Sequence, residues 1–316
     1  MTPRRAAVRF ASIAVIAAAT LAAACTDSNI TGVSHRSGAG DVVLFASNRA
    51  DDNFEIYRIA GNGEDLRRLT VDRVNNDLAP VVSHDGKRIA WQKEIVAPDG
   101  SVTSVEIWVM DIDGRNQHVV VRNAAENLNP SWATGDSVLV YESRAPGNSD
   151  IFRVSLASGA ARNLTSNPFA DQYPRVSPDG AKILFQSNRD LNFDIYVMNL
   201  DGSGVRNLTA NPADDRFASW TPDGTHVVWS RFTDSFDIFL MAADGTGQHS
   251  IVATAFEETN PSVSPDGASV VYQTNRYPRS SLEIAAIDGS GAHALTGSAS
   301  RPAVSDVAPW WTAAAP

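Results

Sequence analysis

Short runs of apolar and β-branched residues, each bounded by turn residues, recur along most of the chain. One unit shows the pattern clearly: the run 182–187 is followed by the run 194–198 and then by the alternating segment 205–209. Pro-Asp-Gly at 178–180 and Asp-Gly at 201–202 separate these runs, and glycine there accepts the positive φ that tight hairpin turns need. The pattern predicts short antiparallel β-strands joined by hairpins.

The strand pattern belongs to an internal repeat. The segment Tyr173–Gly180 recurs as Phe217–Gly224 and Asn260–Gly267, with weaker copies at Ala79–Gly86 and Asn129–Asp136. The second position of each copy falls at 80, 130, 174, 218 and 261, which gives spacings of 50, 44, 44 and 43 residues. Periods of about 40–50 residues with four strands each are typical of β-propeller blades. A four-stranded sheet cannot bury both of its apolar faces alone, so the blades must stack in a ring.

The two ends of the repeat region complete the ring. Residues 42–70 carry only the last three strands of a blade, and the missing first strand is found at 307–312. One blade built from both ends removes the exposed edges that an open array would have. We therefore expect an all-β fold over residues 41–316: a six-bladed β-propeller of four-stranded antiparallel blades, whose closing blade is shared between N- and C-terminal strands.

The first 24 residues read as a secretory signal. Arg4, Arg5 and Arg9 precede the uncharged stretch 10–24, which ends in small residues just before Cys25. The sequence 21–25 resembles a bacterial lipoprotein processing box, which implies cleavage after residue 24 and a lipid anchor on Cys25. The alternative is an ordinary cleaved signal followed by an incidental cysteine. Residues 25–40 are rich in Ser, Thr and Gly and are expected to form a flexible tether.

Charge and cysteine content narrow the partners. The chain has 26 basic and 36 acidic side chains, a net charge of −10, and removal of three arginines with the signal leaves 23 against 36, or −13. An acidic body repels phosphate backbones and anionic lipid surfaces, so we expect no nucleic acid partner and membrane contact through the anchor only. The single cysteine excludes an intrachain disulfide framework. We expect a monomer.

The repeat also resembles a known family. The signature Ser187-Asn188-Arg189, Asp194-Ile195-Tyr196, Asp201-Gly202 and Leu208-Thr209 is similar to the repeat of the TolB propeller domain, and the similarity spans residues 41–312. TolB is a cell-envelope protein that binds peptidoglycan-associated lipoprotein through its propeller, so the resemblance implies an envelope binding protein. We expect no counterpart here of the amino-terminal α/β domain of TolB. Thr26 after the cysteine resembles outer-membrane rather than inner-membrane lipoproteins, which implies a periplasmic, outer-membrane-anchored protein.

No catalytic constellation stands out in the sequence. An arginine precedes an acid by five to seven residues in several blades, and such repeat-borne pairs indicate structural ties: Arg49 with Glu55, Arg144 with Asp150, Arg189 with Asp194, Arg231 with Asp237 and Arg276 with Glu283. The six histidines are scattered without metal-ligand spacing, and no Gly-x-Ser-x-Gly elbow is present. We expect no catalytic residue, no metal and no cofactor. Tryptophans at first-strand positions (Trp132, Trp220, Trp310 and Trp311) are expected to pack blades rather than to bind sugars.

Two functions follow as hypotheses. The leading one is a non-enzymatic scaffold that binds an envelope protein or glycan at one propeller face. The alternative is a polysaccharide-active enzyme, a lyase or glycosidase, with its site at the channel mouth. The candidate binding residues precede the recurring Pro or Ala and vary while their neighbours repeat: Asn129, Tyr173, Arg216, Phe217 and Asn260. A longer connection at 93–106 predicts a hairpin beside the channel mouth on the same face. An ordinary solvated rim is the alternative for this face.

Overall fold

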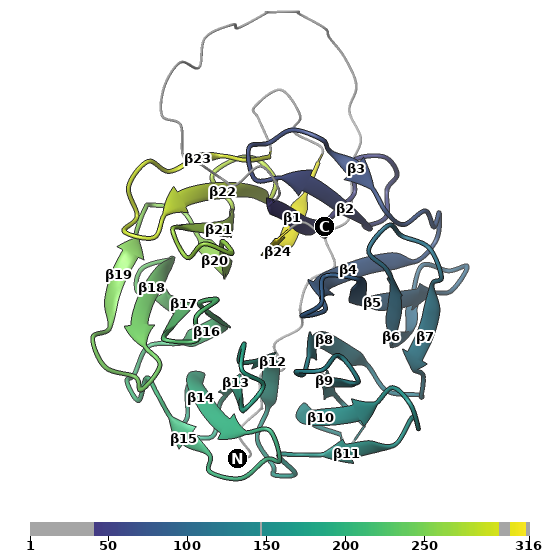
Figure 1. Cartoon of the computed structure of the whole chain (residues 1–316), viewed down its shortest axis with the longest axis horizontal. Helices are drawn as coiled ribbons and strands as arrows, with labels where there is room; N and C mark the ends of the chain where they lie inside the picture. The colour runs from purple at the N-terminus through teal and green to yellow at the C-terminus, as the bar shows by residue number, and fades with distance from the viewer. Residues whose placement is uncertain (1–40, 146, 297–303, 314–316) are drawn as a thin grey trace, which may run out of the picture. The chain divides into compact units, whose positions relative to one another are not determined.

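The computed structural model describes residues 41–145, 147–296 and 304–313. These residues form six four-stranded antiparallel sheets arranged in a ring around a central channel (Figure 1). The all-β, six-bladed propeller predicted from the repeat is confirmed. The expected signal peptide, Cys25 and tether lie outside the described residues, so the boundaries 1–24 and 25–40 stay predictions.

Blade 1 combines strands from both ends of the described chain, and blades 2 and 3 follow it in sequence order. Blade 1 contains β24 (Asp306–Ala313), β1 (Asp41–Ser47), β2 (Glu55–Ala60) and β3 (Arg67–Arg68). Blade 2 contains β4 (Asn76–Val82), β5 (Arg88–Val96), β6 (Val102–Asp111) and β7 (His118–Val121). Blade 3 contains β8 (Asn127–Trp132), β9 (Val138–Ser143), β10 (Asp150–Ser155) and β11 (Ala161–Asn163).

The other three blades follow the same order from the channel outwards. Blade 4 contains β12 (Asp171–Val176), β13 (Lys182–Ser187), β14 (Asp194–Asn199) and β15 (Arg206–Asn207). Blade 5 contains β16 (Asp215–Trp220), β17 (His226–Phe232), β18 (Phe236–Ala242) and β19 (His249–Val252). Blade 6 contains β20 (Glu258–Val263), β21 (Ser269–Thr274), β22 (Ser281–Ala286) and β23 (His293–Ala294).

Blade 1 closes the ring as predicted. β24 pairs with β1 from Asp41↔Ala313 to Ser47↔Asp306, so strands from the two ends of the body lie side by side. Trp311 of β24 is 5% exposed and packs with Val43 of its own blade and Val271 of blade 6. The shared blade is thereby bonded within its own sheet and packed against its neighbour.

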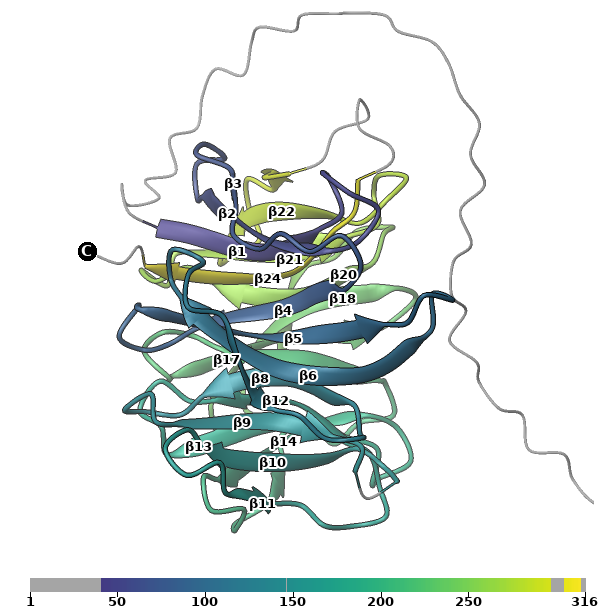
Figure 2. The ribbon, with the colours of Figure 1, turned by 90° about the vertical axis from the view of Figure 1, so that its right-hand side faces the viewer.

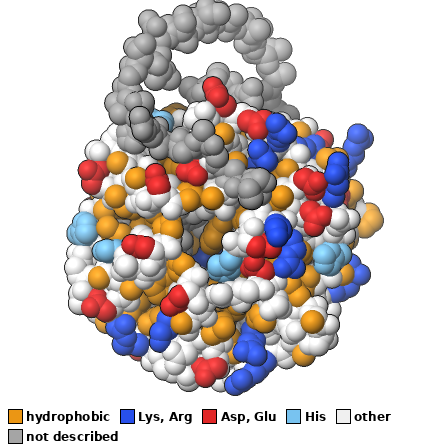
Figure 3. All heavy atoms as spheres, viewed as in Figure 1, with side chains coloured by type: hydrophobic (Ala, Val, Ile, Leu, Met, Phe, Trp, Pro, Cys, Tyr) orange, Lys and Arg blue, Asp and Glu red, His pale blue; other side chains and the backbone are white. Residues whose placement is uncertain are grey.

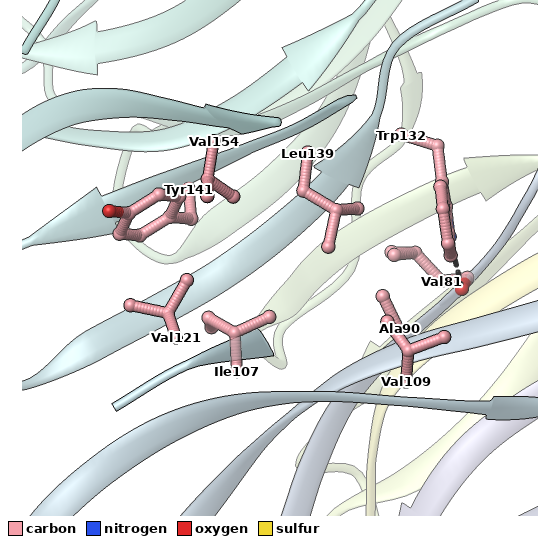
Figure 4. Packing of buried hydrophobic residues seen from close by; sticks show 9 residues of the cluster. All are labelled: Val81, Ala90, Ile107, Val109, Val121, Trp132, Leu139, Tyr141 and Val154. Carbon is pink, nitrogen blue, oxygen red and sulfur yellow. Dashed lines mark hydrogen bonds between the residues drawn. The ribbon is translucent and has the colours of Figure 1, made fainter. Parts of the chain in front are cut away.

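The core lies between blades. The described residues contain one buried apolar cluster at each of the six blade interfaces. Figure 4 shows the cluster between blades 2 and 3, where Ile107 and Val121 face Tyr141 and the indole N–H of Trp132 donates to the carbonyl of Val81 at 3.2 Å. Burying apolar surface at every interface is the driving force that closes the ring.

Buried ion pairs, named the belt, tie the innermost strand to the second strand in blades 1, 2, 4 and 5, but the pairing differs from the one expected. Arg49 binds Asp306 at 2.6 Å, Arg189 binds Asp171 at 2.7 Å and Arg231 binds Asp215 at 2.7 Å. These acids belong to the innermost strands, which the strand register places opposite the arginine end of the second strand. Three of the predicted partners on the third strand, Glu55, Asp150 and Asp194, instead bind side chains of the outermost strand.

That correction applies to four of the five expected pairs. Glu55 binds Arg68 at 2.8 Å, and Asp194 accepts hydrogen bonds from Asn207 and Thr209 at 2.9 and 3.1 Å. Asp150 and Asp237 likewise bind neighbours other than Arg144 and Arg231. Only Arg276 lies as predicted, 3.3 Å from Glu283. The arginines thus form structural ion pairs, but those of blades 1, 4 and 5 join the second strand to the innermost strand rather than to the third.

In blade 6, the inner-strand acid has no cationic partner among the described residues. Glu258 occupies the inner-strand position of the belt and is fully buried, yet Arg276 is turned towards Glu283. Thr254 donates to one carboxylate oxygen of Glu258, and the other oxygen has no hydrogen-bond partner. Burial, followed by the nearby Asp237 carboxylate, raises the pKa of Glu258 to about 7. The folded state therefore favours the protonated side chain.

This environment predicts a pH-dependent stability. Because the pKa of Glu258 is about 7 in the folded state against 4.5 ordinarily, its contribution is complete below pH 4.5 and is lost as pH rises through 7. Glu258→Gln should raise the free energy of unfolding at pH 8 by on the order of 3 kcal/mol, and the gain should vanish near pH 4.5. Urea denaturation across this range measures it. Asp215→Asn, which removes a paired acid, should destabilise at pH 8; a loss for both variants there would contradict the assignment.

Candidate functional site

Each innermost strand carries one residue in the left-handed backbone region. The six residues, named the mouth ring, have φ between 49° and 57°: Ala79, Asn129, Tyr173, Phe217, Asn260 and Ala308. The pairing register shifts beside every one of them, so each marks a β-bulge. Bulky residues avoid this region, so Tyr173 and Phe217 are conformational outliers of the kind that gather at functional sites.

In four of the six blades, the backbone N–H of the ring residue donates to a side chain of the preceding blade. Asn129 donates to the side-chain carbonyl of Gln92 at 3.0 Å, and Phe217 donates to that of Gln186 at 3.0 Å. Ala308 donates to Gln273 at 3.2 Å. In blade 3 the acceptor is a carboxylate oxygen of Glu142, 3.4 Å from the Tyr173 nitrogen. These contacts, named the clasps, join neighbouring blades at the channel wall.

The mouth ring surrounds a chamber of about 230 Å³. Four of the predicted site residues line it together: Asn129, Tyr173, Phe217 and Asn260. Arg216 does not line this chamber. Its guanidinium binds Asp214 at 2.9 Å and lies 4.1 Å from the centre of the Phe193 ring, because it precedes the bulge and sits on the opposite side of the strand. Binding by these residues remains a prediction.

Aromatic rings lead from this chamber towards the surface. Tyr173 and Phe217 meet edge to face with centroids 4.8 Å apart, Phe217 lies 6.3 Å from Phe236, and Phe236 lies 5.4 Å from Phe232. Phe232 is 45% exposed at the end of β17. We name these four residues the aromatic run. It offers a continuous apolar path from the channel to the rim of blade 5.

The chamber and the run belong to the loop face, the side that carries the connections between second and third strands. The longer connection of blade 2 is a hairpin, as predicted: Ile95 pairs with Ser104, and Ala97 donates to the carbonyl of Ser101 at 2.8 Å. The tip of this β5–β6 hairpin projects from the loop face on the right of Figure 2. Blade 2 therefore extends further from the loop face than its neighbours, through the β5–β6 hairpin.

A second chamber, of about 210 Å³, opens on the other side of the ring, the turn face, which carries turns such as Ser83–Gly86. Hydrophobic side chains surround the channel opening on this side (Figure 3). Four tryptophans line the chamber: Trp132, Trp220, Trp310 and Trp311. The indole N–H groups of Trp132 and Trp220 donate to the adjacent blades at 3.2 and 3.1 Å, so these two pack blades as expected.

At the boundary between the chambers lie Arg175, which was missed in the sequence, and Trp310, which was expected only as a packing residue. Arg175 and Trp310 line both chambers and stand two positions after their mouth-ring residues. The other blades carry Val or Ser there, so an arginine among small residues was the available signal. Burial lowers the pKa of Arg175 to about 10, which leaves it cationic at neutral pH. Burial also raises the pKa of the Tyr173 phenol to about 12, so that group stays neutral.

The two chambers offer hydrogen-bonding groups, aromatic surface and the Arg175 cation. Within residues 41–145, 147–296 and 304–313, no group of three or more His, Cys, Asp or Glu side chains is placed to hold a metal ion. In the same part of the chain, no helix has the length and apolar character needed to cross a membrane.

Comparison with known proteins is consistent with this architecture. The family model described as TolB beta propeller domain matches residues 78–308. A protein TolB homolog from Chlorobium luteolum is 31% identical over 148 residues, which is 47% of this chain and 32% of that protein. A Tol-Pal system protein TolB from Escherichia coli is 32% identical over 131 residues, 42% of this chain and 28% of that protein. The chain spans less than a third of the length of these curated relatives.

Solved structures share the fold. TolB from Acinetobacter baumannii superposes with a TM-score of 0.72 at 18% identity, covering 86% of this chain and 66% of that one. Oligogalacturonate lyase from Vibrio parahaemolyticus superposes with a TM-score of 0.56 at 15% identity, covering 79% of this chain and 73% of that one.

The clasps generate a stability prediction. Gln186→Met keeps the side-chain volume but removes the acceptor for the Phe217 N–H, and an unsatisfied buried donor should cost about 1–3 kcal/mol in free energy of unfolding. Ser230 occupies the same position in blade 5, is fully buried, and its hydroxyl has no hydrogen-bond partner. Ser230→Ala should therefore change stability little. Chemical denaturation of both variants tests this, and equal losses would refute the role of the clasps.

Proposed function

Since the chain belongs to the TolB β-propeller domain family, we propose that it is a non-enzymatic cell-envelope lipoprotein whose loop face binds an envelope protein. The observation that carries the proposal is the mouth ring. Its backbone conformation repeats in every blade, while its side chains range from alanine to tyrosine and face one chamber. A rigid scaffold that presents variable side chains is typical of binding surfaces.

The aromatic run supports a protein partner. Tyr173, Phe217, Phe236 and Phe232 bring partly exposed apolar surface to the chamber, and aromatic residues are enriched in protein interfaces. Relatives carrying the name Tol-Pal system protein TolB belong to an envelope system, which favours an envelope protein over a glycan. The glycan-active alternative is favoured only by the likeness to oligogalacturonate lyase, which at 15% identity shows the fold alone.

Lipid anchoring is the second part of the proposal. The lone cysteine follows an uncharged run and three arginines, as in bacterial lipoproteins, and supports a periplasmic protein anchored to the outer membrane.

Replacing the anchor residue tests localisation. Cys25→Ser should move the protein from the membrane fraction to the soluble periplasm while its circular dichroism and melting temperature stay unchanged. Thr26→Ser, one residue later, should fractionate with membranes like the wild type. A Cys25→Ser protein that still sediments with outer membranes would rule out the anchor.

Site-specific photo-cross-linking in cells tests the binding face. A cross-linking amino acid replacing Phe232 on the loop face should give a discrete protein adduct, and one replacing Val205 on the turn face should not. The two sites are matched, since Phe232 is 45% and Val205 is 42% exposed. Adding Phe217→Ala should reduce the adduct at 232, because it removes a ring of the aromatic run. Equal adducts at both sites, or an adduct at 205 alone, would contradict the proposal.

A further inference from the structure

The channel is crossed at its neck by a cation and an aromatic ring from opposite blades. Arg175 lies on β12 and Trp310 on β24, which face each other across the ring (Figure 1). The guanidinium carbon of Arg175 lies 5.6 Å from the centre of the Trp310 ring. Both residues, with Ser219, line both chambers, so a ligand that enters from either face meets them.

Arg175 has no anionic partner in the part of the chain that the structure describes. Its Nη1 donates to the carbonyl of Pro174 at 3.0 Å, and no Asp or Glu lies within ion-pair distance. Belt arginines such as Arg189 and Arg231 each hold a buried aspartate at 2.7 Å. Glu142 on the channel wall is engaged by Ser149, Asn129 and Arg144 instead. A half-buried arginine without a counter-ion is an open site for an anion.

The surroundings select the kind of anion. The loop-face chamber presents the amide side chains of Asn129 and Asn260 beside the Arg175 cation, whereas the Gln273 amide is held by Ala308 and Ser280. Amides hydrogen-bond to peptide groups in both directions, as donor and acceptor. The approach from the surface runs along phenylalanine rings, which favour apolar side chains and offer no hydrogen bonds to sugar hydroxyls. A carboxylate carried by a peptide matches all three features.

We propose that Arg175 binds a carboxylate, an acidic side chain or a C-terminus, on a peptide segment that enters the channel from the loop face. Trp310 holds the guanidinium plane across the neck by cation–π contact, and the chamber amides receive the peptide backbone. This inference rests on the protein-binding role proposed above and assigns its central contact. The peptide carboxylate forms charge-assisted hydrogen bonds with the guanidinium, replacing the solvent that Arg175 lost on folding.

Two short probes test the carboxylate. The probes acetyl-Phe-Glu-Phe-amide and acetyl-Phe-Gln-Phe-amide differ only in one carboxylate. Each is titrated into the whole protein, and binding is followed by tryptophan fluorescence and calorimetry. The wild type should bind the glutamate probe at least ~10-fold more tightly, and Arg175→Gln should abolish the difference. Arg175→Lys should keep part of this difference in affinity, since a lysine retains the positive charge but lacks the paired N–H donors of the guanidinium. Equal affinity of the two probes, or unchanged discrimination in Arg175→Gln, would overturn the proposal.

Stability separates this role from a structural one. Removing an unpaired, desolvated cation should leave the melting temperature of Arg175→Gln unchanged or higher, whereas Arg231→Gln breaks a buried pair and should lower it. A drop for Arg175→Gln as large as that for Arg231→Gln would indicate a structural arginine and overturn the proposal. Glucuronate binding without binding of the glutamate probe would overturn the assignment to a peptide.

The probe titrations and the cross-linking experiment test the carboxylate site and the proposed function separately. A protein adduct at position 232 with no discrimination between the probes would reject the carboxylate site alone. Absence of both would reject the binding role as well.

Discussion

The left-handed residue in each innermost strand is the constraint on which the channel depends. Where the strand bulges, the N–H of that residue leaves the sheet ladder, and a buried donor must find another acceptor. Gln92, Gln186 and Gln273 supply it from the preceding blade. The same backbone kink places the ring side chains around one chamber. One local conformation therefore sets both the contact between blades and the geometry of the candidate site.

The repeat allowed the blades, the strands and the shared closing blade to be predicted, because turn residues and apolar runs are local signals. The bulges could not be predicted, since the ring positions hold Ala, Asn, Tyr and Phe rather than a glycine that would mark a positive φ. The ion pairs were assigned to neighbours in sequence, yet cross-strand register brings Arg189 to Asp171 rather than Asp194. Arg175 was overlooked because its importance depends on Trp310, 135 positions away (175 to 310) on the opposite blade.

The candidate site combines a backbone conformation that is the same in every blade with side chains that differ from blade to blade. Four of the five candidate residues line one chamber, whereas Arg216 lies outside it against Phe193. The family and the fold are shown by the match over residues 78–308 and by the superposition on TolB from Acinetobacter baumannii. Under the proposed function, the choice of ligand depends on chamber residues that the repeat does not dictate: Tyr173, Phe217 and Arg175. The proposed binding role is therefore tested by changing these residues rather than those of the family signature.

The pairing of Asp41 with Ala313 also places both ends of the described body on one side of the propeller. Both residues lie where β1 begins and β24 ends, on the turn face, so any chain that precedes residue 41 joins the body on that side. The mouth ring, the aromatic run and the β5–β6 hairpin all belong to the opposite side of the disc. The point where the described chain begins and the surface with the variable side chains therefore lie on opposite sides of the disc.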